Sequence, residues 1–255
     1  QEPEHTSPDD EYPYLLVMDR GERSLHDACA KERIAGYKVD TIIEAFRSIL
    51  GCVEVLHASG VIHGDLKQRN ILRFIVDDVA KWILCDMDAS ALRGRTIGRK
   101  TSSAYAPPEL ARRKYAGGQS GVLDMAEPSF DVWSLGVILF ELCAGRTLFA
   151  QDTNNDELVE LADRTRLCAW HTISDEELEP VLLAADGASD ALIDSAKNLI
   201  RWCLKGDPLE RPTAGQILSH AFLAPGGPLA AMSMRYFGFL SHAQADASST
   251  VATLY

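Results

Sequence analysis

The sequence predicts a mainly α-helical protein with one short β-hairpin in its first third. Segment 40–59 repeats apolar residues at three- and four-residue spacing, which is typical of an amphipathic helix. Segment 131–143 is apolar on nearly every side, which predicts a helix buried in the core. Strand-type patterns occur only at 14–18, 71–75 and 81–85, and the last two segments form the expected hairpin.

The remaining elements follow from local signals along the chain. Residues 1–13 are acidic and contain prolines, which predicts a disordered N-terminal segment. A short helix is expected over 24–30, with Ser24 as its cap, and the aperiodic segment 86–108 is expected to be a loop. The folded region then spans 14–223, and the tail at 224–255 is rich in small residues and weakly ordered. Further helices are expected at 157–162, 191–204 and 214–221.

Composition narrows the class of protein. The chain has 255 residues and a net charge of -12, which argues against binding to nucleic acid or to anionic membranes, since both reward a basic surface. Its six cysteines are scattered without a C-x-x-C pair, which favours a reducing compartment and an intracellular, cytoplasmic location. No apolar stretch is long enough for a membrane span. Because the chain opens with Gln1 rather than Met, a fragment of a longer protein is the plain interpretation.

Chemistry-bearing residues gather between positions 63 and 86. Phosphoryl transfer from a nucleotide needs a carboxylate to accept the hydroxyl proton, a cation to stabilise the moving charge, and oxygen ligands for Mg²⁺. Asp65, Lys67, Asn70 and Asp86 supply this set. A hairpin that joins Asn70 to Asp86 brings the two oxygen ligands back to one place. The pattern therefore predicts a phosphotransferase site.

The stretch 63–70 (HGDLKQRN) resembles the catalytic loop of the protein kinases, H-R-D-L-K-x-x-N, with Gly64 in place of the usual Arg. This resemblance implies that Asp65 is the catalytic base and that Lys67 contacts the γ-phosphate of ATP. It further implies that Asn70 is a ligand of a second Mg²⁺ ion.

The segment 86–88 and His63 can also be compared with the family. Asp86 stands where the family has the Asp of D-F-G, so the resemblance assigns it to Mg²⁺, while Met87 and Asp88 depart from the pattern. The lost Gly predicts a restricted backbone at Asp88, since only Gly takes positive φ freely. His63 is expected to brace the loop rather than to transfer protons.

The loop alone is also similar to that of small-molecule phosphotransferases such as aminoglycoside and choline kinases. Three later segments favour the protein kinases. Segment 105–109 (YAPPE) resembles the Y-x-A-P-E that ends the activation loop, with Pro at the Ala position. Segment 131–136 (DVWSLG) resembles the start of the central helix, in which Asp131 braces the catalytic-loop backbone. Segment 207–213 (DPLERPT) resembles D-P-x-x-R-P-T, whose Arg211 is expected to form a buried pair with Glu109.

The resemblance extends to the nucleotide and to the substrate. Segment 15–21 is similar to the last strand of the N-terminal lobe and the hinge, so Met18 is the expected gatekeeper. The backbone of Asp19 and Gly21 would then face the adenine of ATP. Lys67 within L-K-x-x-N and Ser102 at the substrate site indicate Ser/Thr rather than Tyr residues of protein substrates as the acceptors.

Two elements of the family have no counterpart upstream of position 14: a Gly-rich loop and a strand Lys with its partner Glu. The sequence therefore predicts the C-terminal lobe of a protein kinase together with the hinge, and no N-terminal lobe. Such a chain is expected to bind ATP poorly and to be inactive alone. The intact parent is expected to be a Ser/Thr kinase. The alternative is a pseudokinase, a scaffold that binds protein partners without catalysis; the altered motif at 86–88 favours it, and the retained set of Asp65, Lys67, Asn70 and Asp86 opposes it.

Overall fold

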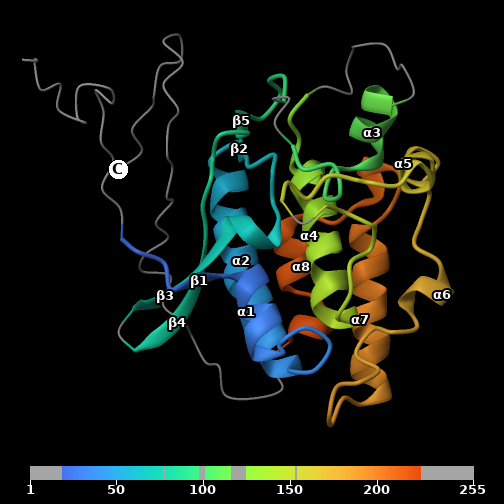
Figure 1. The fold of residues 1–255 in the computed structure, drawn as a ribbon. Helices are drawn as coiled ribbons and strands as arrows, with labels where there is room; N and C mark the ends of the chain where they lie inside the picture. The colour runs from blue at the N-terminus through green and yellow to red at the C-terminus, as the bar shows by residue number, and fades with distance from the viewer. Residues whose placement is uncertain (1–18, 77, 98–100, 116–124, 153, 225–255) are drawn as a thin grey trace, which may run out of the picture.

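The computed structural model describes residues 19–76, 78–97, 101–115, 125–152 and 154–224. These ranges hold eight α-helices and five short strands (Figure 1). The helices are α1 (Leu25–Glu32), α2 (Val39–Ala58), α3 (Pro108–Tyr115), α4 (Pro128–Ala144), α5 (Leu161–Cys168), α6 (Asp175–Leu178), α7 (Asp190–Cys203) and α8 (Ala214–Leu218). The strands are β1 (Arg23–Ser24), β2 (Val61–Ile62), β3 (Ile71–Val76), β4 (Val79–Leu84) and β5 (Ala91–Leu92).

Helix α4 forms the centre of the described structure and lies between α2 and α7 (Figure 1). Every residue from Phe130 to Cys143 is buried, as expected for a helix that is apolar on all sides. Gly136 allows the close approach of α7, because a Cβ at this position would lie 2.8 Å from the Cβ of Cys203. The helix ends at Gly145, which takes a left-handed φ of 69° and caps it.

The sheets are small and antiparallel. Strand β3 pairs with β4 in the register Ile71↔Leu84, which confirms the hairpin expected from the sequence, and β1 adds a third strand on the other side of β3. Strand β2 pairs with β5 in the register Val61↔Leu92. This second pair corrects the expectation that segment 86–108 is all loop. A strand of two residues is too short to show a period, so its pairing depends on the tertiary fold.

The first two helices follow from their sequence signals. The Oγ of Ser24 accepts a hydrogen bond from the backbone N–H of Asp27 (3.1 Å), so Ser24 is the cap of α1 as expected. Helix α2 agrees with the amphipathic pattern to within a residue at each end. Its buried side packs against β4, α8 and α4.

Two helix predictions need correction, and two helices were not predicted. The helix expected at 157–162 begins only at Leu161, because Leu158 is extended and forms an antiparallel bridge with Gln151. Helix α8 ends at Leu218 and is followed by a 3₁₀ turn at Ala221–Leu223, so segment 214–221 is not one helix. Helices α3 and α6 were not predicted, since α3 is mostly polar and α6 is only four residues long.

Some expectations concern the chain outside the described residues. These are the disordered segment 1–13, the strand at 14–18 and all of the tail beyond position 224. Within the described residues, no helix combines the length and apolar character that crossing a membrane requires.

Candidate active site

The buried carboxylate of Asp131 binds the backbone at the start of the predicted catalytic loop. Asp131, in the first turn of α4, is 1% exposed. Its Oδ2 accepts the backbone N–H of His63 (2.9 Å), and its Oδ1 accepts the backbone N–H of Gly64 (3.0 Å). The Nε2 of His57, in the last turn of α2, lies 2.9 Å from the same Oδ2. Asp131 therefore braces the start of the loop, as expected, and the His57 contact, which was not predicted, adds a link to α2.

Gly64 is required by the local backbone. It has a φ of 80°, which a side chain rarely tolerates, and a Cβ would lie only 2.6 Å from the carbonyl oxygen of Ala89. The departure from the usual Arg therefore fits this loop conformation. Next to it, the His63 ring is fully buried and its Nε2 contacts the carbonyl oxygen of Cys85 at 3.2 Å, which is a bracing contact.

Three other predicted site residues contact Asp65. Its Oδ1 accepts the backbone N–H of Ser102 (2.7 Å), and its Oδ2 lies 3.3 Å from the ammonium of Lys67. The Nδ2 of Asn70 donates to the backbone oxygen of Asp65 (2.9 Å). Lys67 in turn donates to the Oγ of Ser102 (2.7 Å). The Asp65 carboxylate, the Lys67 ammonium and the Ser102 hydroxyl therefore lie close together.

The β3–β4 hairpin brings the two predicted metal ligands to the same end of the sheet. Asn70 precedes β3, its backbone oxygen accepts the N–H of Cys85 (2.9 Å), and Asp86 is the next residue after Cys85. Asp86 takes a left-handed φ of 64°, a conformation that is uncommon outside Gly and clusters at functional sites. Asp88 has no positive φ, which agrees with the restricted backbone expected there from the lost Gly.

The chemistry of these two residues fits Mg²⁺. Because the Asn70 amide nitrogen is directed at Asp65, its amide oxygen remains as a hard ligand, and Asp86 adds a carboxylate. Among the described residues, no group of three or more His, Cys, Asp or Glu side chains could hold a metal ion. Mg²⁺ commonly takes only one or two carboxylates from a protein and completes its shell with water and substrate phosphates, so the pair is compatible with it.

Glu109 and Arg211 form the buried pair that the sequence predicted. The Arg211 Nη1 donates to Glu109 Oε1 (2.8 Å) and its Nη2 donates to Oε2 (2.7 Å). The two side chains are 0% and 3% exposed. Arg211 also donates to the carbonyl oxygens of Lys205 and Ser129, and its guanidinium lies 5.2 Å from the ring centroid of Trp133. This pair joins α3 to the segment before α8.

A buried polar cluster beneath the loop was not predicted. The Oε2 of Glu141, in α4, accepts hydrogen bonds from the Tyr105 hydroxyl and from Gln68, each at 2.7 Å. Burial raises the pKa of Glu141 to about 7 although both hydrogen bonds oppose this shift. The one sequence signal was a charged residue within the apolar stretch 135–142.

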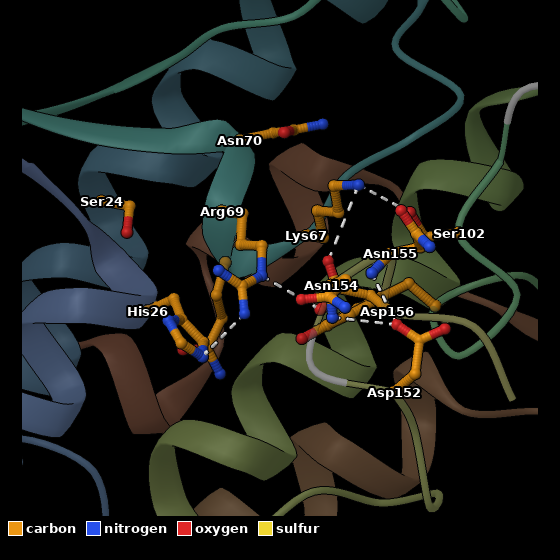
Figure 2. A network of polar contacts seen from close by, with 12 residues as sticks. Ser24, His26, Lys67, Arg69, Asn70, Ser102, Asp152, Asn154, Asn155 and Asp156 are labelled. Carbon is orange, nitrogen blue, oxygen red and sulfur yellow. Dashed lines mark hydrogen bonds and ion pairs between the residues drawn. The ribbon is translucent and has the colours of Figure 1, made fainter. Parts of the chain in front are cut away.

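Asp156 was also missed. It is 3% exposed, and its carboxylate lies against the side chains of Lys67 and Arg69 (Figure 2). It follows a polar stretch that gave no motif, so only the tertiary structure reveals its contact with the catalytic loop.

The structure describes only part of the predicted hinge. Met18 lies outside the described residues. Asp19 is exposed, and Gly21 lies beside β3, where a Cβ would be 3.2 Å from the Cβ of Leu72. The next residue, Glu22, donates its N–H to the carbonyl oxygen of Arg73 (2.7 Å). The adenine-facing role of Asp19 and Gly21 stays a prediction.

Comparison with known proteins agrees with these features. Residues 5–223 match the family described as protein kinase domain. The chain is 31% identical over 195 residues to "Calcium-dependent protein kinase 19" of Arabidopsis thaliana, and the aligned region covers 75% of this chain and 30% of that protein. It is 31% identical over 224 residues to "Probable serine/threonine-protein kinase CCRP1" of Zea mays, covering 86% of this chain and 31% of that protein.

A human relative gives a similar result. The chain is 30% identical over 229 residues to "Ribosomal protein S6 kinase alpha-6" of Homo sapiens, covering 84% of this chain and 26% of that protein. The aligned region thus spans about a third or less of each of these relatives. The family match covers most of the chain and includes the catalytic loop, the buried Glu109–Arg211 pair and the central helix, so the chain belongs to the eukaryotic protein kinase family, on its serine/threonine branch.

Proposed function

We propose that this chain carries the catalytic loop of an enzyme that transfers the γ-phosphate of ATP to Ser or Thr residues of protein substrates. The observation that supports this most is the grouping of Asp65, Lys67, Asn70 and Ser102, with the Asp65 carboxylate 3.3 Å from the Lys67 ammonium. This grouping places a proton acceptor next to a cation.

Each side chain has one role in the proposed reaction. Asp65 accepts the proton of the substrate hydroxyl as the oxygen attacks phosphorus. Lys67 stabilises the negative charge on the phosphoryl group as it moves, and Asn70 keeps Asp65 oriented through its Nδ2 donor. Asn70 and Asp86 would hold Mg²⁺, which when bound neutralises charge on the phosphates of ATP.

The acceptor class follows from the substrate loop. Ser102 donates its backbone N–H to Asp65 and receives a hydrogen bond from Lys67 on its hydroxyl (2.7 Å), so the loop lies directly beside the proposed base. Lys67 in the L-K-x-x-N segment and Ser102 on this loop together favour an aliphatic hydroxyl, as in Ser and Thr. We assign the expected adenine contacts to the backbone of Asp19 and Gly21.

We further propose that residues 14–223 are the hinge and C-terminal lobe of a kinase domain. The central buried helix α4, the catalytic loop that it braces and the Glu109–Arg211 pair support this assignment. ATP affinity and turnover then depend on the phosphate-covering elements of the other lobe.

The test is transfer of labelled γ-phosphate from ATP to Ser- and Thr-containing peptides by the full-length protein. Asp65→Asn should lower kcat by at least about 10²-fold, because general-base catalysis contributes about 10² to 10⁴. Asp175→Asn on the exposed start of α6 is the matched control. An Asp65→Asn variant with at least half of the wild-type kcat would contradict the assigned base.

The non-catalytic scaffold is the competing function, and the altered motif Asp86-Met87-Asp88 is the observation that favours it. A full-length protein that binds ATP and Mg²⁺ without any transfer would support it. The absence of positive φ at Asp88 weakens this alternative, since the lost Gly does not distort the backbone here.

A further inference from the structure

The segment between α4 and α5 turns back toward the catalytic loop. Gln151 and Leu158 form an antiparallel bridge, and Asp152 donates its N–H to the carbonyl oxygen of Glu157 (2.9 Å). Near the tip of this turn, Asp156 takes a left-handed φ of 56°. Its side chain is nevertheless only 4% exposed, because it points into the protein rather than to solvent (Figure 2).

The Asp156 carboxylate lies between two cations of the catalytic loop. Its Oδ1 accepts a hydrogen bond from the Nε of Arg69 (3.2 Å), and its Oδ2 lies 3.7 Å from the Nζ of Lys67 (Figure 2). Its backbone oxygen accepts the N–H of Ala104 (3.1 Å), two residues after Ser102. One residue therefore contacts the catalytic loop at two side chains and the substrate loop at its backbone.

These contacts matter because they are poorly screened. The side chain of Lys67 is 15% exposed and that of Asp156 is 4% exposed, so their charges interact more strongly than in a surface pair. The Oδ2 atom of Asp156 has no hydrogen-bond partner among the described residues, which leaves the Lys67 ammonium as its compensating charge. Without the Asp156 carboxylate, Lys67 and Arg69 would each lose an anionic partner.

The Lys67 ammonium is held from three sides. Ser102 Oγ lies at 2.7 Å, Asp65 Oδ2 at 3.3 Å and Asp156 Oδ2 at 3.7 Å. Three partners in different directions restrict the rotamers of a long, flexible side chain, and Asp156 comes from an element outside the catalytic and substrate loops. Its charge thereby couples the α4–α5 segment to the position of the Lys67 ammonium.

We propose that Asp156 is a positioning residue that holds Lys67 beside Asp65 and fixes the substrate loop at Ala104. It acts through Lys67 and does not touch the reacting atoms. The kinetic consequence rests on the proposed function, because Lys67 is there the cation that stabilises the moving phosphoryl group.

The direct test is Asp156→Asn in the full-length protein. The amide oxygen can still accept the hydrogen bond from Arg69, and the backbone contact with Ala104 remains, so the substitution removes mainly the negative charge near Lys67. We expect kcat to fall about tenfold, as for a misplaced catalytic group, while KM for ATP changes less than about twofold. Asp175→Asn serves as the matched control for a change of the same type at an exposed site.

A double-mutant cycle separates positioning from a structural role. In a Lys67→Met background, Asp156→Asn should not lower the residual kcat further, because the group it positions is gone. In an Arg69→Met background, Asp156→Asn should still lower kcat. The reverse result, an effect that persists without Lys67 and vanishes without Arg69, would overturn the proposal.

If the wild type shows no phosphate transfer, urea unfolding of the same variants still tests whether Asp156 and Lys67 are coupled. An absence of phosphate transfer by the wild type refutes the proposed function, and the stability cycle then decides on Asp156 alone. Non-additive shifts of the unfolding midpoint for Lys67→Met and Asp156→Asn would support the proposed coupling. Additive shifts for this pair would overturn it.

Discussion

Replacing Arg211 with methionine should destabilise the protein by breaking an ion pair whose two side chains are almost fully buried. The Glu109 side chain is only 3% exposed, and the variant removes its two hydrogen bonds of 2.8 and 2.7 Å with Arg211. It also leaves the carbonyl oxygens of Lys205 and Ser129 without this donor. Removing one partner of a buried pair costs about 3–5 kcal/mol, because an uncompensated charge remains inside. For a domain of this size, such a loss lowers Tm by about 10 °C.

The assay is urea and thermal unfolding followed by circular dichroism, with two comparison variants. Arg201→Met breaks the exposed pair with Asp175, whose side chain is 95% exposed, and should leave the free energy of unfolding nearly unchanged. Glu109→Leu combined with Arg211→Met should recover part of the loss, because no lone charge stays buried. If Arg211→Met costs less than about 1 kcal/mol, the buried-charge argument is wrong.

Three further predictions concern the same region. Burial raises the pKa of Glu141 from 4.5 to about 7, so the native state binds more protons than the unfolded state between these values. Stability should therefore be greatest at the acidic end of this window and fall by up to about 3 kcal/mol as pH rises through 7; Glu141→Gln should remove that fall in urea midpoints measured from pH 5 to 8. Gly64→Ala should cost about 1–3 kcal/mol in urea unfolding, because it combines a φ of 80° with a Cβ 2.6 Å from Ala89 O. Asp131→Asn replaces one acceptor oxygen with an NH₂ group, so the backbone N–H of either His63 or Gly64 loses its partner. We therefore expect kcat to fall and the free energy of unfolding to drop by about 2 kcal/mol.

Each of these has a result that would contradict it. A Glu141→Gln variant with the same pH dependence as the wild type would show that this carboxyl does not titrate in the window. An unchanged unfolding midpoint for Gly64→Ala would mean that the loop relaxes around a methyl group. An Asp131→Asn variant with normal kcat and stability would remove the argument that this carboxylate fixes the loop.

Local sequence signals predicted the elements that depend on short-range physics. The Ser24 cap, the amphipathic α2 and the apolar α4 each show their pattern within one segment, so the structure agrees with them closely. The β3–β4 hairpin likewise consists of two short segments rich in apolar residues, each of strand length. Asp65, Lys67 and Asn70 could be named as candidate site residues because they form one short motif.

The elements that were missed depend on partners far away in sequence. Strand β5 has two residues and exists only because β2 lies beside it. The helix expected from 157 begins later because Glu157 is held by Ser103 and Lys114 of the substrate loop and α3. Asp156 shows no motif at all, and its role depends on where the turn at 151–158 packs.

Because α4 is buried from Phe130 to Cys143, hydrogen exchange in this helix should report global stability. A helix packed on every side has no exposed turn at which it could open alone, so its amide hydrogens should exchange with solvent only when the whole domain unfolds. Hydrogen-exchange rates in α4 would then report the free energy of unfolding of every variant described above. The short α6, with an exposed start, should exchange by local opening and stay insensitive to the same substitutions.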